Sequence, residues 1–124
     1  MNVVLWIVTI VLALGFLAAG TLKVVRSREQ LSASGMGWAT DFSPGMVKLI
    51  GTAEILGAIG LILPALVDVA PILVPIAAAA LAVVMIGAVV THVRRHELNL
   101  IAAPTVLLVL SLFVAIFRFG PNSF

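Results

Sequence analysis

Four long apolar blocks, separated by short polar stretches, run through the sequence. They cover approximately residues 3–22, 44–63, 71–92 and 98–119. Each block is close to the ~20 residues that an α-helix needs to cross the hydrocarbon core of a bilayer. The longest polar stretch, residues 23–43, is rich in Gly and Ser but holds spaced apolar residues. It is predicted to lie in the membrane interface, with Trp38 as an anchor.

Prolines predict where these helices begin and end. Ser43 and Pro44 have the pattern of an N-cap followed by the first helical position, and Pro71 suits the same first position in the third helix. The second helix is predicted to end at Pro64. Pro104 is expected in the second turn of the fourth helix, where a proline can kink the helix.

The predicted fold is an all-α membrane protein, a four-transmembrane-helix antiparallel bundle that forms a single domain over residues 1–124. Short connections favour this arrangement because they make sequential helices antiparallel neighbours. Small residues at four-residue spacing are candidates for close helix contacts, although Ala and Gly are also simply common in membrane spans. The candidate pairs are Gly15 with Ala19, Ala53 with Gly57, and Ala78 with Ala82.

Composition excludes several classes of protein. The chain is 63% hydrophobic and only 10% charged, which is too little charge to cover the surface of a soluble domain of 124 residues. Membrane lipids are therefore expected partners. The absence of cysteine excludes disulfides, thiol catalysis and cysteine-ligated metal sites. No basic patch lies outside the loops, so nucleic acid is not expected as a partner.

A cleavable signal peptide is a minor alternative for the first block. Leu17 to Gly20 resembles a cleavage site, but the N-terminus lacks the usual cation and the block is long for a signal sequence. We therefore expect the first block to be a membrane span.

Basic residues gather in two loops that the predicted topology places on the same side of the membrane. The cations of the first loop and its flank are Lys23, Arg26, Arg28 and Lys48, and those of the second loop are Arg94 and Arg95. The opposite side has only Arg118, which is expected to extend to the interface. The positive-inside rule then places both basic loops in the cytoplasm and both termini outside.

Glu54 is the main candidate for a functional side chain. It lies roughly 15 Å along the second helix from Pro44, near the middle of the bilayer, where a carboxylate needs shelter and a partner. Lys23, at the end of the first helix, is the best candidate partner, and His92 lies at the same membrane level. We therefore expect a buried polar cluster of Lys23, Glu54 and His92. It either binds a ligand or is a structural ion pair that sets the helix register.

His92 and His96 are four residues apart, and would share a helix face if the helix continued past His92. Two histidines at that spacing can ligate a metal or haem, but solvated interfacial histidines explain them as well, and no metal site is predicted. Nucleotide-binding motifs and a complete catalytic constellation are not recognisable in the sequence. The sequence therefore assigns no enzymatic activity.

Several segments resemble one known family. The first helix ends in Gly20-Thr21-Leu22-Lys23, a G-x-x-K pattern, and the stretch from Trp38 to Pro64 contains Glu54 in a distinctive context. Further similar segments are Met85 to His92 followed by Arg94-Arg95, and the terminal Arg118-Phe119. On these segments the chain is identified as a member of the DoxX-like family. The resemblance implies a four-helix bundle in the bacterial cytoplasmic membrane.

The resemblance leaves the function open. Some members are linked to thiosulfate:quinone oxidoreduction or to oxidative-stress complexes, and distant relatives act as assembly factors. Our first expectation is an accessory subunit or a binder of a lipid-like ligand, without catalysis of its own and without an intrinsic cofactor. Its partner would be a membrane protein or another copy. The alternative is a quinone-interacting component of an oxidoreductase complex. Proton transport through Glu54 is the least favoured hypothesis, because four spans leave a narrow lumen and show no inverted repeat.

Overall fold

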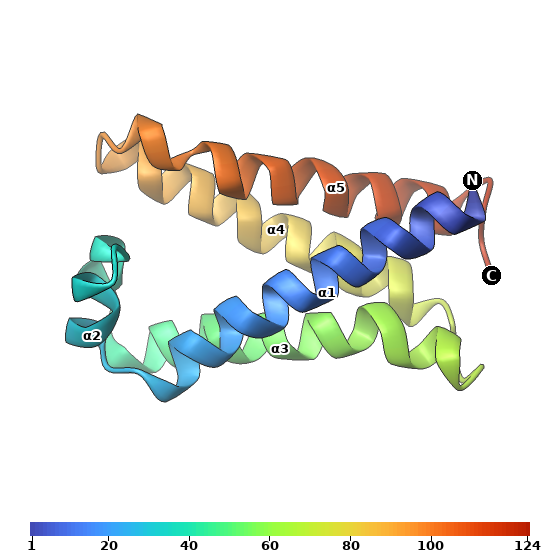
Figure 1. The fold of residues 1–124 in the computed structure, drawn as a ribbon, viewed down its shortest axis with the longest axis horizontal. Helices are drawn as coiled ribbons and strands as arrows, with labels where there is room; N and C mark the ends of the chain where they lie inside the picture. Colours follow the sequence, from blue (N-terminus) through green and yellow to red (C-terminus); the bar gives the residue numbers. More distant parts are fainter.

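The computed structural model describes residues 1–124 as helices joined by short connections, with no strand (Figure 1). The long helices are α1 (Asn2–Val25), α3 (Pro44–Leu66), α4 (Leu73–Arg94) and α5 (Ala102–Phe119). The short ones are α2 (Arg28–Ala33) and the 3₁₀ helices η1 (Gly37–Asp41) and η2 (Leu98–Leu100). Four helices are long and apolar enough to cross a membrane, the last of them including η2. The predicted all-α membrane bundle is confirmed.

The bundle consists of two helix pairs. α1 packs along α3, α4 packs along α5, and α3 contacts α4 between the pairs (Figure 1). The two pairs lie close together at the end that carries both termini, and they diverge toward the end that carries α2. Which end faces the cytoplasm stays a prediction.

The centre of the bundle is an apolar core to which all four long helices contribute. Its fully buried members include Phe16, Leu61, Leu81 and Val114. The outward faces of the same helices keep many large apolar side chains exposed, among them Ile7, Leu14, Leu56, Val83 and Val109. An apolar surface of this extent is stable against lipid and not against water, so lipid contact follows from the arrangement of the helices.

The start of α3 agrees with the prediction, whereas its end does not. Ser43 caps α3 by accepting a hydrogen bond from the amide of Met46 at 3.1 Å, so the predicted start at Pro44 is confirmed. The predicted end at Pro64 is wrong, because α3 continues to Leu66. A proline in the last turn lacks the N–H group for one helical hydrogen bond. The residues after it can still form theirs, so the helix does not have to end at the proline.

The other two prolines also lie differently from the prediction. Pro71 precedes α4, which begins at Leu73. Pro104 lies in the first turn of α5 and not in the second, because η2 takes up the preceding residues and α5 begins at Ala102. A missing N–H is tolerated in a first turn, where it would have no intrahelical partner, and so the expected kink is replaced by the 3₁₀ turn before α5.

Only one of the three predicted small-residue pairs lies fully in the core. Ala78 and Ala82 are buried between the helix pairs, as predicted. Gly15 and Ala53 are exposed, and a methyl group added to Gly15 would meet nothing within 4 Å. The contacts predicted for these two residues are wrong, because spacing alone does not show which face of a helix turns inward.

Candidate functional site

α1 and α3 touch backbone to backbone where Gly20 meets Gly51. A Cβ atom built on Gly20 would lie 2.6 Å from the carbonyl oxygen of Gly51, and one on Gly51 would lie 2.7 Å from the carbonyl oxygen of Gly20. Real atoms cannot approach so closely, so only glycine fits at either position. The crossing brings together Lys23 and Glu54, each of which lies three residues after its glycine.

Lys23 and Glu54 form a buried ion pair. The Nζ atom of Lys23 lies 2.5 Å from Oε1 of Glu54, and the Glu54 side chain is 1% exposed. The indole ring of Trp38 covers the ammonium group, with 5.6 Å between Nζ and the ring centroid. Lys23 lies in the last turn of α1, which continues to Val25, three residues past its predicted end. Within a membrane span, a carboxylate is stable only when paired in this way or protonated.

His92 pairs with Glu97 and not with Glu54. Its Nδ1 atom lies 3.1 Å from Oε1 of Glu97, which also accepts a hydrogen bond from Nε of Arg95 at 3.0 Å. The same Arg95 donates to Oδ2 of Asp41 at 2.6 Å. This network therefore ties the α4–α5 turn to the end of η1, far away in the sequence. The four residues are called the loop network below.

The shared helix face expected for His92 and His96 does not form. α4 ends at Arg94, and His96 has φ +57 in the turn that follows. His96 is exposed, whereas His92 is partly buried. The two imidazole rings therefore do not lie on one helix face. The four-residue spacing of the two histidines then no longer favours a metal or haem site.

The loop network makes part of the stability depend on pH. The hydrogen bond with His92, followed by that from Arg95, holds the pKa of Glu97 below its ordinary value of 4.5, against an opposing effect of desolvation. A carboxyl group with a lowered pKa stabilises the fold above its ordinary pKa, and this stabilisation is lost as the pH falls through the lowered value. We expect the Glu97→Gln variant to melt slightly below the parent protein near neutral pH. The difference should shrink below pH 4.5, the ordinary pKa of the group, and disappear once the pH has fallen through the lowered pKa.

Thermal unfolding in detergent, followed by far-ultraviolet circular dichroism across this pH range, measures the effect. Glu29→Gln is the matched control, because Glu29 makes no ion pair and lies on the same side of the bundle. A melting difference for Glu97→Gln that stays constant on acidification would contradict the assigned pKa direction.

A cavity of about 720 Å³ lies between the two helix pairs, at the end where they diverge. Lys23 and Glu54 line it from α1 and α3, and His92 lines it from α4. The three residues singled out in the sequence therefore face one space, although His92 forms no hydrogen bond or ion pair with the other two. Most of the remaining wall is apolar, and its larger members are Met36, Trp38, Phe42, Ile50, Val84, Met85, Leu100 and Leu107.

The interfacial segment contributes more to this site than the sequence indicated. Trp38 was expected to anchor the chain at the membrane surface, yet it lines the cavity together with Met36 and Phe42. The sequence does not predict that Gly20 and Gly51 meet each other at a helix crossing. The sequence feature that could have indicated this crossing is that each glycine lies three residues before a member of the ion pair. The Asp41–Arg95 contact has no comparable signal.

Arg118 lies at the opposite end of the bundle, where the residues that follow α5 bury its side chain. It is 3% exposed, donates to the carbonyl oxygen of Asn122 at 3.0 Å, and packs over the ring of Phe124. The reason is that the chain turns back after Phe119, so that the last residues cover the guanidinium group. Arg118 takes no part in the cavity.

The fold and the site define a class: a small integral membrane protein of four helices, with a cavity between two helix pairs and a buried ion pair in its wall. A family comparison matches residues 7–114 to the DoxX-like family, and the chain belongs to that family. The matched region includes Lys23, Glu54 and His92, so the resemblance found in the sequence is confirmed. No curated protein and no solved structure matches the chain.

Proposed function

We propose that this protein binds one lipid-like molecule in the cavity and acts as an accessory subunit for a partner membrane protein or a second copy of itself, without catalysing a reaction alone. The observation that carries the proposal is the cavity of about 720 Å³ with largely apolar walls. Ligand sites in proteins typically span roughly 300–1,000 Å³ and combine apolar walls with a few polar groups.

The polar groups define which head group suits the cavity. Lys23 already donates to Glu54, so the pair carries no net charge, and the remaining hydrogens of the ammonium group can bond an oxygen of a ligand. Thr91 and His92 line the cavity from α4. A molecule with an apolar chain or ring and an uncharged oxygen-bearing head is therefore the best match.

A quinone is the second candidate, which would make the protein a component of an oxidoreductase complex. The observation that favours it is the placement of Lys23 and His92 on different helix pairs around one cavity, with the ring of Trp38 beside them. A quinone has carbonyl oxygens on two sides of a flat ring, which such an arrangement can contact. The side chains of this protein supply no redox centre, so electrons would have to come from a separate donor.

Filling the cavity tests the proposal. Ala88 lines the cavity from α4, whereas Ala80 lies on the same helix and faces outward. The Ala88→Phe variant is expected to bind the ligand at least about tenfold more weakly than the parent, and Ala80→Phe, the matched control, should bind normally. The phenyl ring occupies the space that the ligand needs, while the control adds the same ring toward lipid.

The readout is native mass spectrometry of the purified protein, with 1-oleoylglycerol and a short-chain ubiquinone as probes. Binding of the glycerolipid that only Ala88→Phe weakens supports the first proposal, and binding of the quinone alone supports the second. Equal binding by the two variants, or no binding of either probe by the parent protein, would reject the cavity as a ligand site. Turnover of a substrate by the purified protein alone would contradict the accessory role.

A further inference from the structure

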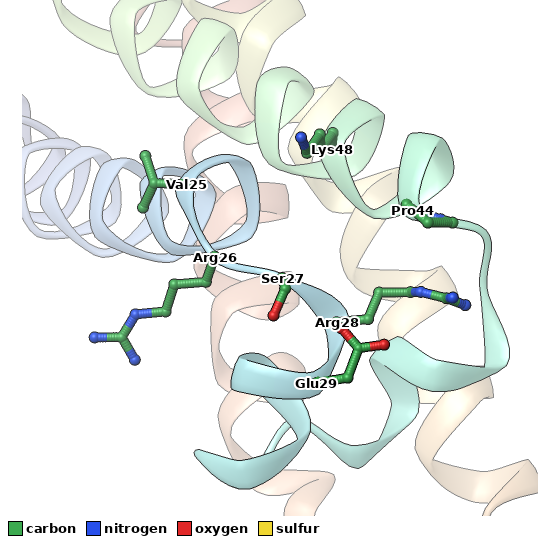
Figure 2. A pocket seen from close by; sticks show the side chains of 7 residues that line it. All are labelled: Val25, Arg26, Ser27, Arg28, Glu29, Pro44 and Lys48. Atoms are coloured by element: carbon green, nitrogen blue, oxygen red, sulfur yellow. The ribbon is translucent and has the colours of Figure 1, made fainter.

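A second hollow lies beside the α1–α3 contact, on a different face from the cavity. It has a volume of about 290 Å³ and shares no lining residue with the cavity. Lys48 and Glu54, six residues apart on α3, are separated by about 240° around the helix, which explains why they line different spaces. The residues that matter for its chemistry are Val25, Arg26, Arg28, Glu29, Pro44 and Lys48, and they are called the basic groove below (Figure 2).

The basic groove carries more positive than negative charge. It contains three cations and one carboxylate, that of Glu29. Arg26, Arg28 and Lys48 take part in none of the ion pairs of the chain. Arg26 makes one long hydrogen bond, 3.3 Å to Ser34, and Arg28 donates to the carbonyl oxygen of Phe42 at 2.8 Å. The cations therefore retain donors for an external anion.

The basic groove lies at the depth where lipid head groups are expected. α1 ends at Val25 and α3 begins at Pro44, so the groove marks the level at which the apolar spans meet the polar segment (Figure 2). Val25 is 68% exposed, and Leu49, next to Lys48, is 61% exposed. Basic side chains at the end of a span can contact the head group of a lipid, and exposed apolar side chains beside them can contact its acyl chains.

We propose that the basic groove binds the phosphate of an anionic phospholipid, whose acyl chains lie against the exposed apolar residues of α1 and α3. A guanidinium group can bond two phosphate oxygens, and Lys48 supplies a mobile point charge. Arg26 and Arg28 extend in opposite directions (Figure 2), so one of them pairs with Lys48 at a single phosphate. A phospholipid fits better than a free phosphate ion because apolar side chains adjoin the cations. This site is separate from the ligand proposed for the cavity.

The test compares two variants that each remove one cation from the same end of the bundle. Lys48 belongs to the basic groove, whereas Arg94 lines the cavity. In bilayers of phosphatidylcholine with a minor share of phosphatidylglycerol, retained phosphatidylglycerol is counted by native mass spectrometry. Lys48→Gln should weaken its binding about fivefold, whereas Arg94→Gln should change it by less than about twofold.

Each other result would overturn the proposal. Equal losses in the two variants would indicate general attraction to a charged surface. A loss only in Arg94→Gln would place the anionic lipid in the cavity. Displacement of phosphatidylglycerol by millimolar inorganic phosphate would show a site for the free ion. Because Lys48 is exposed, its substitution leaves the packing of the bundle unchanged, and circular dichroism checks this.

Discussion

Replacing Glu54 with leucine is expected to destabilise the bundle by roughly 3–5 kcal/mol, because it leaves the ammonium group of Lys23 buried without a counter-charge. Lys23 is 8% exposed and lies under the ring of Trp38, so an unpaired ammonium group would be held in a largely apolar environment. Unfolding by sodium dodecyl sulfate in mixed micelles, followed by circular dichroism, measures the loss. Lys48→Leu is the control, since it removes an exposed charge of the same end.

The double variant Lys23→Leu/Glu54→Leu should recover most of that stability, because replacing a whole buried ion pair with apolar side chains is often neutral or favourable. Its ligand binding then distinguishes the two roles considered for the pair. A stable double variant that no longer binds the probe of the cavity would show that the pair contacts the ligand. Retained binding would make the pair a structural device that sets the register of α1 against α3. A double variant as unstable as Glu54→Leu alone would contradict the ion-pair account.

The Gly51→Ala substitution should also destabilise the bundle, although it adds only one methyl group. Its Cβ would lie 2.7 Å from both the carbonyl oxygen of Gly20 and the Cβ of Lys23. Backbone atoms cannot move aside as a flexible side chain can, so α1 and α3 must separate. We expect a loss of about 1–3 kcal/mol, the usual range for overpacking. Separation of the helices should also lengthen the Lys23–Glu54 contact and weaken binding in the cavity.

Gly15→Ala is the matched control for this prediction. It makes the same chemical change in α1, at a glycine with nothing within 4 Å of the added methyl group. Alanine is a better helix former than glycine by up to about 1 kcal/mol, so this variant should be as stable as the parent or slightly more stable. Unfolding in mixed micelles measures both variants. A neutral Gly51→Ala would show that the helices do not cross at Gly20 and Gly51. A damaging Gly15→Ala would contradict the open space beside Gly15.

The local pattern of residues predicted the spans well. Each apolar block became a membrane-length helix, and the N-cap at Ser43 began α3 where expected. The sequence also predicted that Glu54 needs a partner, because the free-energy cost of a charge near the middle of a span depends on its position along that span. Motif segments identified the family as well. All of these inferences use information that lies within one segment of the chain.

Other features required contacts between distant segments. The sequence predicts that Lys23 and His92 lie at one membrane level, but it does not predict that His92 pairs with Glu97 or that Asp41 reaches Arg95. It likewise could not show that the last residues cover Arg118. A hydrogen bond depends on the direction of each side chain, and the membrane level of a residue does not determine that direction.

The sequence by itself therefore determined where each residue lies along a membrane-length helix, and so its expected depth, whereas only the tertiary structure decided which way it faces. Depth depends on the hydropathy and length of one helix, both of which are local properties. The rotation of each helix and the divergence of the two pairs depend on packing, such as the close approach at Gly20 and Gly51. The cavity exists because of that divergence, and so no single segment could predict it.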